Sequence, residues 1–369
     1  MTHPTFSRRG FLLGAGAAAI GGPAFLAACG SGGSGSGSKT ISWANWQLYI
    51  EDDKPKTSPT LLNFQKANPY KVNYQAVIED NDTFTSKYEG KLDKKQAIGF
   101  DLVVLTSWMA SRWIKKGWVE PLDLTAIPNE KNLLDRHLQA AFDPGRKYSL
   151  PYAEGQTGIA YFPEKAGFKI ESMTDFLKPE LKGKVSILSE LRDCGGLFLL
   201  MMGEDPATAD KATILKAITE VGKLKAAGQF YKVTGNEYTD LLTRGDIVAA
   251  IAWSGDVAVL KKDKPDLEWV LPKDGGMSFI DTFMIPNGAS DKAGAEALMN
   301  YLYDPKVSGP LFESIQYVSP VKDAGSFMSA DAAKNPLVNP PADAKIFAFR
   351  DFDDAEAAEL DDAWAKAIQ

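Results

Sequence analysis

Two kinds of hydrophobic pattern alternate along the chain. Val72, Tyr74, Ala76 and Ile78 occupy every second position, which is the period of a strand. The run 100–105 is short and largely apolar, which is typical of a strand buried on both faces. Because strand patterns alternate with helical patterns, the sequence predicts an α/β fold with a mostly parallel sheet and helices on both of its faces.

Helix signals are clear shortly after the first predicted strand. Ser58 can cap a helix and Pro59 suits the first helical position, while an Asn-Pro pair at 68–69 ends the helix. Further helices are expected at 82–88, 107–116, 194–202, 212–226, 238–243, 293–303 and 306–315, and further strands at 39–46, 185–188, 247–252, 268–271 and 282–285.

The beginning of the chain has the pattern of an export signal. Arg8 and Arg9 precede an uninterrupted small and apolar run at 10–28. Segment 7–12 resembles a twin-arginine signal, but Leu13 stands where a Lys is often found, so the general secretion route stays open. The glycines and the proline of the apolar run disfavour a permanent transmembrane helix.

A lipid attachment site follows the apolar run. Residues 26–30 read Leu-Ala-Ala-Cys-Gly and resemble a bacterial lipobox, in which Cys29 becomes the lipidated first residue. Residues 30–38 are all Gly or Ser, a composition typical of a flexible tether. We therefore expect a signal peptide at 1–28, a lipidated Cys29 with its tether at 29–38, and an exported protein anchored to the outer face of the cytoplasmic membrane.

Composition limits the chemistry of the chain. Its 369 residues carry a formal net charge of −7, which disfavours a nucleic acid partner because such binding needs a basic face. Outside the signal segment the chain has one histidine, His137, which we expect on a helix surface, and one cysteine besides Cys29, which is Cys194. Hydrolases with a Ser-His pair and His-bound zinc sites are therefore disfavoured. We expect no enzyme activity, no cofactor and no metal.

Acids and aromatic residues remain as candidates for binding. The chain has eight tryptophans and 48 acidic residues. Carboxylates hold ammonium groups through charge-assisted hydrogen bonds, and tryptophan faces add cation–π attraction. Glu190 and Asp193 follow the strand expected at 185–188, at the carboxyl end where open α/β sheets bind ligands. We interpret Asp256 as a loop acid.

Seven short segments occur in a specific order. They read Asn-Trp-Gln-Leu-Tyr at 45–49, Phe-Asp-Leu-Val-Val-Leu-Thr-Ser-Trp at 100–108, Ser-Leu-Pro-Tyr followed by a Gly at 149–155, Glu-Leu-Arg-Asp at 190–193, Ile-Ala-Trp-Ser-Gly at 251–255, Gly-Gly-Met-Ser-Phe-Ile-Asp at 275–281 and Gln-Tyr-Val-Ser-Pro at 316–320. Together they resemble the spermidine/putrescine-binding proteins of polyamine ABC importers. The resemblance implies that the ligand is held by Trp46, Tyr49, Thr106, Trp108, Glu190, Asp193, Trp253, Phe279, Asp281 and Tyr317.

The chain departs from the family pattern at three places. Phe279 stands where the family often has Trp, and Glu154 stands where it often has an aromatic residue. Arg350 lies in the region that corresponds to a late amide-bearing segment, and an arginine in the pocket would disfavour a polycation. Glu190 and Asp193 also suit a helix N-terminus, and the tryptophans also suit a core.

The resemblance implies a two-lobed periplasmic-binding-protein fold, type II-like, with the ligand cleft between lobes that two crossovers join. Lobe 1 is expected at 39–154 and 281–325, and lobe 2 at 155–280 and 326–369. The implied function is that of a monomeric solute-binding lipoprotein that captures a polyamine and delivers it to an ABC permease and its ATPase. The alternative is the same fold and importer role with a quaternary amine, an amino-acid derivative or a sugar. A secreted enzyme and a purely structural surface lipoprotein are both disfavoured.

Overall fold

The structure is a computed structural model that describes residues 39–51, 57–335, 337–338 and 344–369. The predicted signal peptide, Cys29 and the Gly/Ser tether lie outside the described residues. Those three assignments therefore stay predictions. Ser38–Gln369 forms one compact unit.

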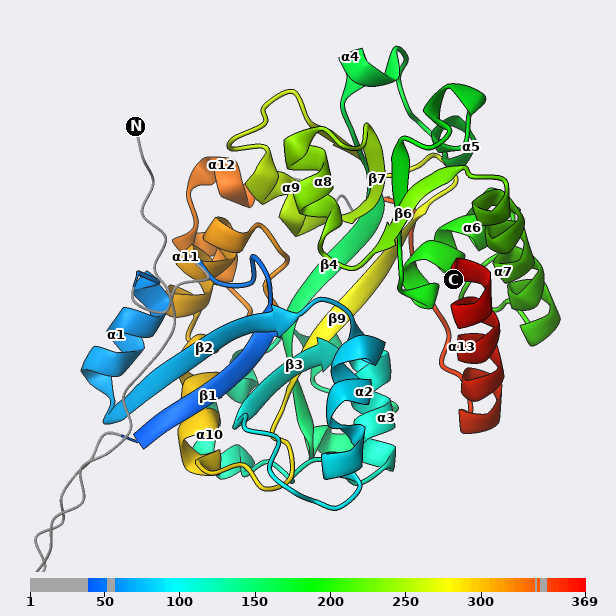
Figure 1. Cartoon of the computed structure of the whole chain (residues 1–369). Coiled ribbons are helices and arrows are strands. Elements are labelled where there is room, and N and C mark those ends of the chain that lie inside the picture. The colour runs from blue at the N-terminus through cyan, green and yellow to red at the C-terminus, as the bar shows by residue number, and fades with distance from the viewer. Residues whose placement is uncertain (1–38, 52–56, 336, 339–343) are drawn as a thin grey trace, which may run out of the picture. The chain divides into compact units, whose positions relative to one another are not determined.

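The described residues form one ten-stranded mixed sheet (Figure 1). Its main path has the order β2-β1-β3-β9-β4-β7-β5-β6, while β10 pairs with β9 and β8 pairs with β4. The strands are β1 (Lys39–Trp46), β2 (Tyr70–Ile78), β3 (Leu102–Thr106), β4 (Ser149–Tyr161), β5 (Val185–Leu188), β6 (Phe230–Thr234), β7 (Ala249–Trp253), β8 (Glu268–Val270), β9 (Gly276–Met284) and β10 (Ile346–Ala348).

Two groups of parallel strands flank a central antiparallel pair. Strands β2, β1 and β3 are mutually parallel, and so are β7, β5 and β6. Between the two groups run β4 and β9, which are antiparallel to each other and to β7 and β3 respectively (Figure 1). The prediction of parallel strands is thus correct for the two outer groups. The two central strands differ from it, because they pair antiparallel with each other and with their outer neighbours.

The helices begin where local chemistry favours them. Ser58 caps α1 (Pro59–Ala67) by accepting the N–H of Leu61 at 3.3 Å, as predicted. The second helix starts earlier than expected, because Asp80 caps α2 (Asn81–Leu92) by accepting the N–H of Thr83 at 2.7 Å. The others are α3 (Ser107–Lys115), α4 (Pro163–Ala166), α5 (Met173–Phe176), α6 (Gly196–Met201), α7 (Lys211–Ala226), α8 (Tyr238–Arg244), α9 (Ser254–Leu260), α10 (Lys292–Leu302), α11 (Pro305–Ile315), α12 (Ala330–Ala333) and α13 (Asp354–Ile368).

One predicted helix differs in its first turn. The segment Leu191–Gly195 is π-helical and leads directly into α6. Single π-helical turns occur frequently at functional sites. Here the turn carries Asp193, which therefore lies on irregular backbone next to the carboxyl end of β5.

The buried residues pack on both faces of the sheet. Trp43 in β1 is fully buried and contacts Tyr74 and Tyr152 edge-on, with ring centroids 5.0 and 5.7 Å apart.

The terminal helix α13 lies beside α7 (Figure 1). No described helix is both long and apolar enough to cross a membrane.

The expectation that His137 lies on a helix surface is wrong. His137 is 1% exposed and sits in a short 3-10 turn, Asp135–His137. Its Nε2 lies 3.2 Å from an oxygen of Glu154, a carboxylate that also pairs with Arg136 at 2.7 Å. Glu154 lies on β4, outside the local sequence pattern of the turn, so the pattern alone misplaced the ring.

Candidate functional site

The carboxyl ends of the six strands in the two parallel groups meet at one cavity. Trp46 ends β1, Thr106 ends β3 and Trp253 ends β7. The loops that follow β2, β5 and β6 add Asn81, Glu190 with Asp193, and Asn236. Open α/β sheets bind ligands at such an edge. We call the resulting space the inner cavity; its lining residues are Trp46, Tyr49, Asn81, Thr106, Glu190, Asp193, Asn236, Trp253, Phe279 and Asp281.

Asp281 is the acid that the central strand β9 contributes. It is 2% exposed, and its two oxygens accept the hydroxyls of Tyr49 at 2.5 Å and Thr106 at 2.8 Å. Burial raises the pKa of Asp281 to about 7 even though both hydrogen bonds favour the charged carboxylate. A nearby ammonium group would therefore be a strong counter-charge for this side chain.

Glu190 and Asp193 approach from the other parallel group. The backbone N–H and the side-chain amide of Asn81 donate to one oxygen of Glu190, at 3.0 and 2.9 Å. Asp193 accepts the hydroxyl of Thr157 at 2.6 Å and the indole N–H of Trp253 at 3.2 Å. Burial is the main cause that raises the pKa of Glu190 well above its usual value and the pKa of Asp193 less strongly. Both acids are thus held in place by neutral donors.

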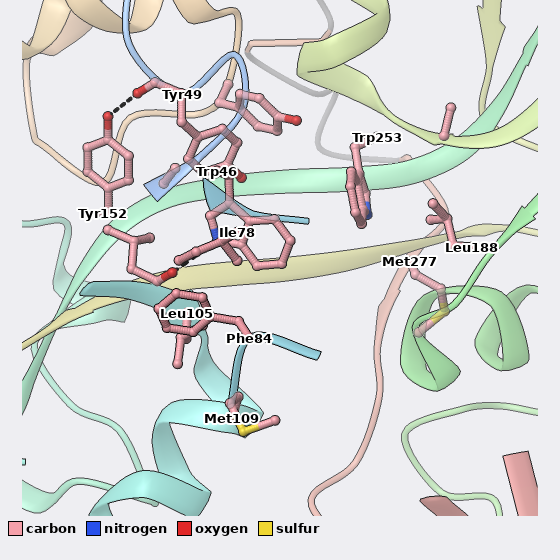
Figure 2. Packing of buried hydrophobic residues seen from close by; sticks show 14 of the residues in the cluster. Trp46, Tyr49, Ile78, Phe84, Leu105, Met109, Tyr152, Leu188, Trp253 and Met277 are labelled. Carbon is pink, nitrogen blue, oxygen red and sulfur yellow. Dashed lines mark hydrogen bonds between the residues drawn. The ribbon is translucent and has the colours of Figure 1, made fainter. Parts of the chain in front are cut away.

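Aromatic rings form the remaining walls. The rings of Trp46 and Trp253 meet edge-on with centroids 5.8 Å apart. The ring centroid of Phe279 lies 6.3 Å from that of Trp253. Figure 2 shows Trp46 and Trp253 together with Tyr49, whose backbone carbonyl accepts the hydroxyl of Tyr152. The indole N–H of Trp46 donates to the carbonyl of Val104 at 3.1 Å. Each indole is therefore fixed by a hydrogen bond that leaves its faces available for stacking.

A fourth buried acid lies behind the aromatic wall. Asp256, interpreted from the sequence as a loop acid, is 0% exposed. It accepts hydrogen bonds from Asn236 at 2.9 Å and from the hydroxyls of Tyr238 and Tyr317, both at 2.7 Å. The ring of Tyr317 can reach it because Gly255 has no side chain; a Cβ there would lie 2.1 Å from the ring.

Positive charge is missing from the lining. Among the described residues that line the inner cavity, three are carboxylates and none is Lys, Arg or His. Arg350 pairs with Glu356 instead, at 2.8 Å, and Glu154 pairs with Arg136 and His137. Neither Arg350 nor Glu154 lines the cavity. Within the described part of the chain no group of His, Cys, Asp and Glu residues has the arrangement of a metal site.

Comparison with known proteins identifies the family. Residues 61–340 match the family model described as "Bacterial extracellular solute-binding protein". The chain is a member of that family. It is 32% identical to the putrescine-binding periplasmic protein PotF of Escherichia coli over 89% of this chain and 91% of that protein. It is 29% identical to the spermidine/putrescine-binding periplasmic protein 1 of Haemophilus influenzae over 82% of this chain and 81% of that protein.

Solved structures give the same result for the fold. A structure from Listeria monocytogenes superimposes on this solute-binding protein with a TM-score of 0.77 and 25% identity, over 89% of this chain and 99% of the other. The spermidine/putrescine substrate-binding protein PotD of Streptococcus pneumoniae superimposes with a TM-score of 0.71 and 20% identity. That match covers 89% of this chain and 98% of the other. The resemblance and the two-lobed periplasmic-binding-protein fold predicted from the sequence are thereby confirmed. The lobe boundaries stay a prediction.

The structure brings most of the predicted site residues together. Eight line the inner cavity: Trp46, Tyr49, Thr106, Glu190, Asp193, Trp253, Phe279 and Asp281. Tyr317 lies directly behind, with its ring 4.6 Å from that of Tyr49 and 6.3 Å from that of Phe279. Trp108 differs, because it faces a neighbouring cavity.

Two lining residues escaped the sequence analysis. Asn81, the first residue of α2, connects three parts of the chain, because its side-chain amide donates to Glu190 and also to Thr106, both at 2.9 Å. Asn236 lies in the turn after β6, and its side-chain oxygen is buried without a partner among the described residues. Both residues come shortly after parallel strands. Open α/β sheets bind ligands at the carboxyl ends of their strands, and applying this rule to every strand would have identified both residues.

Proposed function

We propose that this solute-binding protein captures a polyamine such as putrescine or spermidine in the inner cavity. One observation carries the proposal: the lining holds three buried carboxylates and, within the described residues, no basic side chain. Such charges are costly to bury unless cations pair with them. A ligand with two or more ammonium groups supplies those cations.

The neutral parts of the cavity fit the same ligand. The indole faces of Trp46 and Trp253 and the ring of Phe279 are suited to cover methylene groups and to attract ammonium groups. The unpartnered oxygen of Asn236 offers one more acceptor for an ammonium N–H. Charged ends and an aliphatic middle are the defining features of a polyamine.

The lining disfavours two of the three alternative solutes. An amino-acid derivative would place its carboxylate among Glu190, Asp193 and Asp281, with no described cation in the lining to receive it. A sugar would leave the buried carboxylates without a counter-charge. A quaternary amine suits the aromatic walls but balances only one carboxylate. The names of the two curated relatives, which refer to putrescine and spermidine, also support a polyamine.

The transport role follows from the family. We propose that lobe 1 (39–154 and 281–325) and lobe 2 (155–280 and 326–369) close around the ligand by a hinge motion. The closed monomer then delivers the ligand to an ABC permease and its ATPase and catalyses no reaction. We further propose that Cys29 carries the lipid that anchors the exported protein to the outer face of the membrane. The relatives' description as periplasmic supports export.

A thermal-shift panel on the purified full-length protein tests the ligand class. The panel contains putrescine, spermidine, choline, glutamate and maltose. A polyamine at a hundred times its dissociation constant should stabilise the fold by about 2.7 kcal/mol, while the others leave the midpoint unchanged. A shift with choline or maltose alone would reject the polyamine and leave the family role intact.

A further inference from the structure

The inner cavity shares a wall with a second, larger space. Trp108, Arg112, Arg192, Phe352 and Asp361 are among the residues that line this outer cavity. Three short segments each contribute residues to both spaces, and we call these segments the partition. They are Asn81–Asp82, Thr106–Trp108 and Glu190–Asp193, which place Asn81, Thr106, Glu190 and Asp193 on the inner side and Asp82, Trp108 and Arg192 on the outer side.

The inner side of the partition is closed by hydrogen bonds. The amide of Asn81 donates to Thr106 and Glu190, both at 2.9 Å, while its oxygen accepts the N–H of Thr106 at 3.1 Å. These contacts connect all three segments of the partition. A ligand that passed through it would have to break them.

The outer side of the partition carries a fixed positive charge. The guanidinium carbon of Arg192 lies 4.1 Å from the ring centroid of Trp108 and 4.6 Å from that of Phe352. Arg112 lies 5.4 Å from the same indole and pairs with Asp82 at 3.0 Å and with Asp361. The arginine that directly precedes Asp193 is therefore clamped between two aromatic rings rather than free to swing away.

We propose that Arg192 limits the length of the ligand, so that the inner cavity selects short diamines over longer polyamines. This inference rests on the proposed function of the same cavity. A short diamine places both ammonium groups among the inner carboxylates. A longer ligand brings an ammonium group to the partition, where the Arg192 charge repels it and the Trp108–Phe352 clamp blocks its path.

Calorimetric titration of the full-length protein with three amines tests the inference. The amines are putrescine, spermidine and 1,8-diaminooctane, which matches the length of spermidine but lacks its middle charge. The wild type should bind putrescine at least tenfold more tightly than either long amine. Arg192→Met removes the charge and keeps the aliphatic stem, and it should reduce that ratio at least fivefold by gaining affinity for the long amines. Arg244→Gln is the control, because Arg244 pairs with Asp246 at 2.9 Å and lines neither cavity, and it should leave the ratio unchanged.

The outcomes separate the two proposals. If the wild type binds no amine, the proposed function is wrong and this inference falls with it. If the wild type binds putrescine and spermidine equally well, or if folded Arg192→Met keeps the wild-type ratio, only the inference is wrong. Phe352→Leu loosens the clamp without changing a charge and should lower the ratio in the same direction, which keeps the test decisive if Arg192→Met does not fold.

Discussion

The inner and outer cavities are built from similar side chains but balance their charges in opposite ways. Both contain aromatic rings and carboxylates, and they share the partition as a wall. The outer lining has four acids and four bases among its described residues, and Arg112 pairs with two of those acids. The inner lining has three acids and no base among its described residues.

The difference supports the inner cavity as the proposed ligand site. Carboxylates that already face guanidinium groups gain little from a further cation. Among the described residues, hydroxyl, amide and indole groups donate to the carboxylates of the inner cavity, and these neutral donors orient the carboxylates without neutralising them. Because unpaired buried charge is unfavourable, the inner cavity is the space whose energy a cationic ligand lowers most.

The largest expected effect comes from removing an inner carboxylate. Asp281→Asn keeps the shape of the side chain and removes its charge, so we expect polyamine affinity to fall on the order of a hundredfold or more. The matched control in the outer cavity is Asp361→Asn, which leaves Arg112 paired with Asp82 and should change affinity less than threefold. Calorimetric titration of the two variants measures the comparison directly. Equal losses in both variants would show that the two cavities do not differ as argued.

Proton binding should compete with the ligand in the inner cavity. Burial raises the pKa of Asp281 to about 7, whereas the unfolded value is near 3.8. Since the folded pKa is the higher one, the unliganded protein should lose stability as pH rises from about 4 to about 7. Polyamine affinity should change in the opposite direction, falling by up to about tenfold per pH unit below pH 7, because the proton occupies the carboxylate that the ligand needs.

Thermal unfolding and calorimetry between pH 5 and pH 8 measure both trends. Asp281→Asn is the control, and it should flatten each profile without abolishing the contributions of Glu190 and Asp193, whose pKa values burial also raises. An affinity that is independent of pH in the wild type would mean that Asp281 stays charged in the free protein.

The next prediction compares the loss of affinity when a tryptophan of the inner cavity or one of the outer cavity is replaced. Trp253→Phe removes the indole N–H that Asp193 accepts and part of the ring face, so we expect about a tenfold loss of affinity. Trp118→Phe removes a similar hydrogen bond, to Asp93 at 3.0 Å, on the outer side. Both variants should lose stability, but only Trp253→Phe should lose affinity. Titration of both proteins, with unfolding curves for each, tests this.

Several parts of the fold and of the site were predictable because local chemistry determines them. Ser58 and Pro59 mark a helix start that needs no tertiary information. Glu190 and Asp193 follow the strand predicted at 185–188, and the rule for open α/β sheets then places them at the cavity. The aromatic residues Trp46 and Trp253 were predicted in a different way, from the resemblance of the ordered motifs to a known family.

The remaining features depend on contacts between distant segments. Trp108 faces the outer cavity because α3 begins at Ser107, and the helical turn carries its side chain away from Thr106. Asn81 and Asn236 follow strands where an asparagine is equally typical of a turn, so composition alone does not mark them as lining residues. The length of β4 and β9 likewise comes from their pairing with each other, which the sequence pattern of either strand alone does not show.

The smallest expected effect concerns Arg350, the residue that raised the strongest objection to a cationic ligand. Its guanidinium donates to Glu356 at 2.8 Å and to the carbonyl of Ala209, and it does not line the inner cavity. Arg350→Gln should therefore leave polyamine affinity within twofold of the wild type and cost about 1 kcal/mol or less of stability, as expected for a partly exposed ion pair. Calorimetry and thermal unfolding measure the two quantities. A clear gain in polyamine affinity would show that the Arg350 charge acts on the ligand and would place this side chain in the electrostatics of the inner cavity.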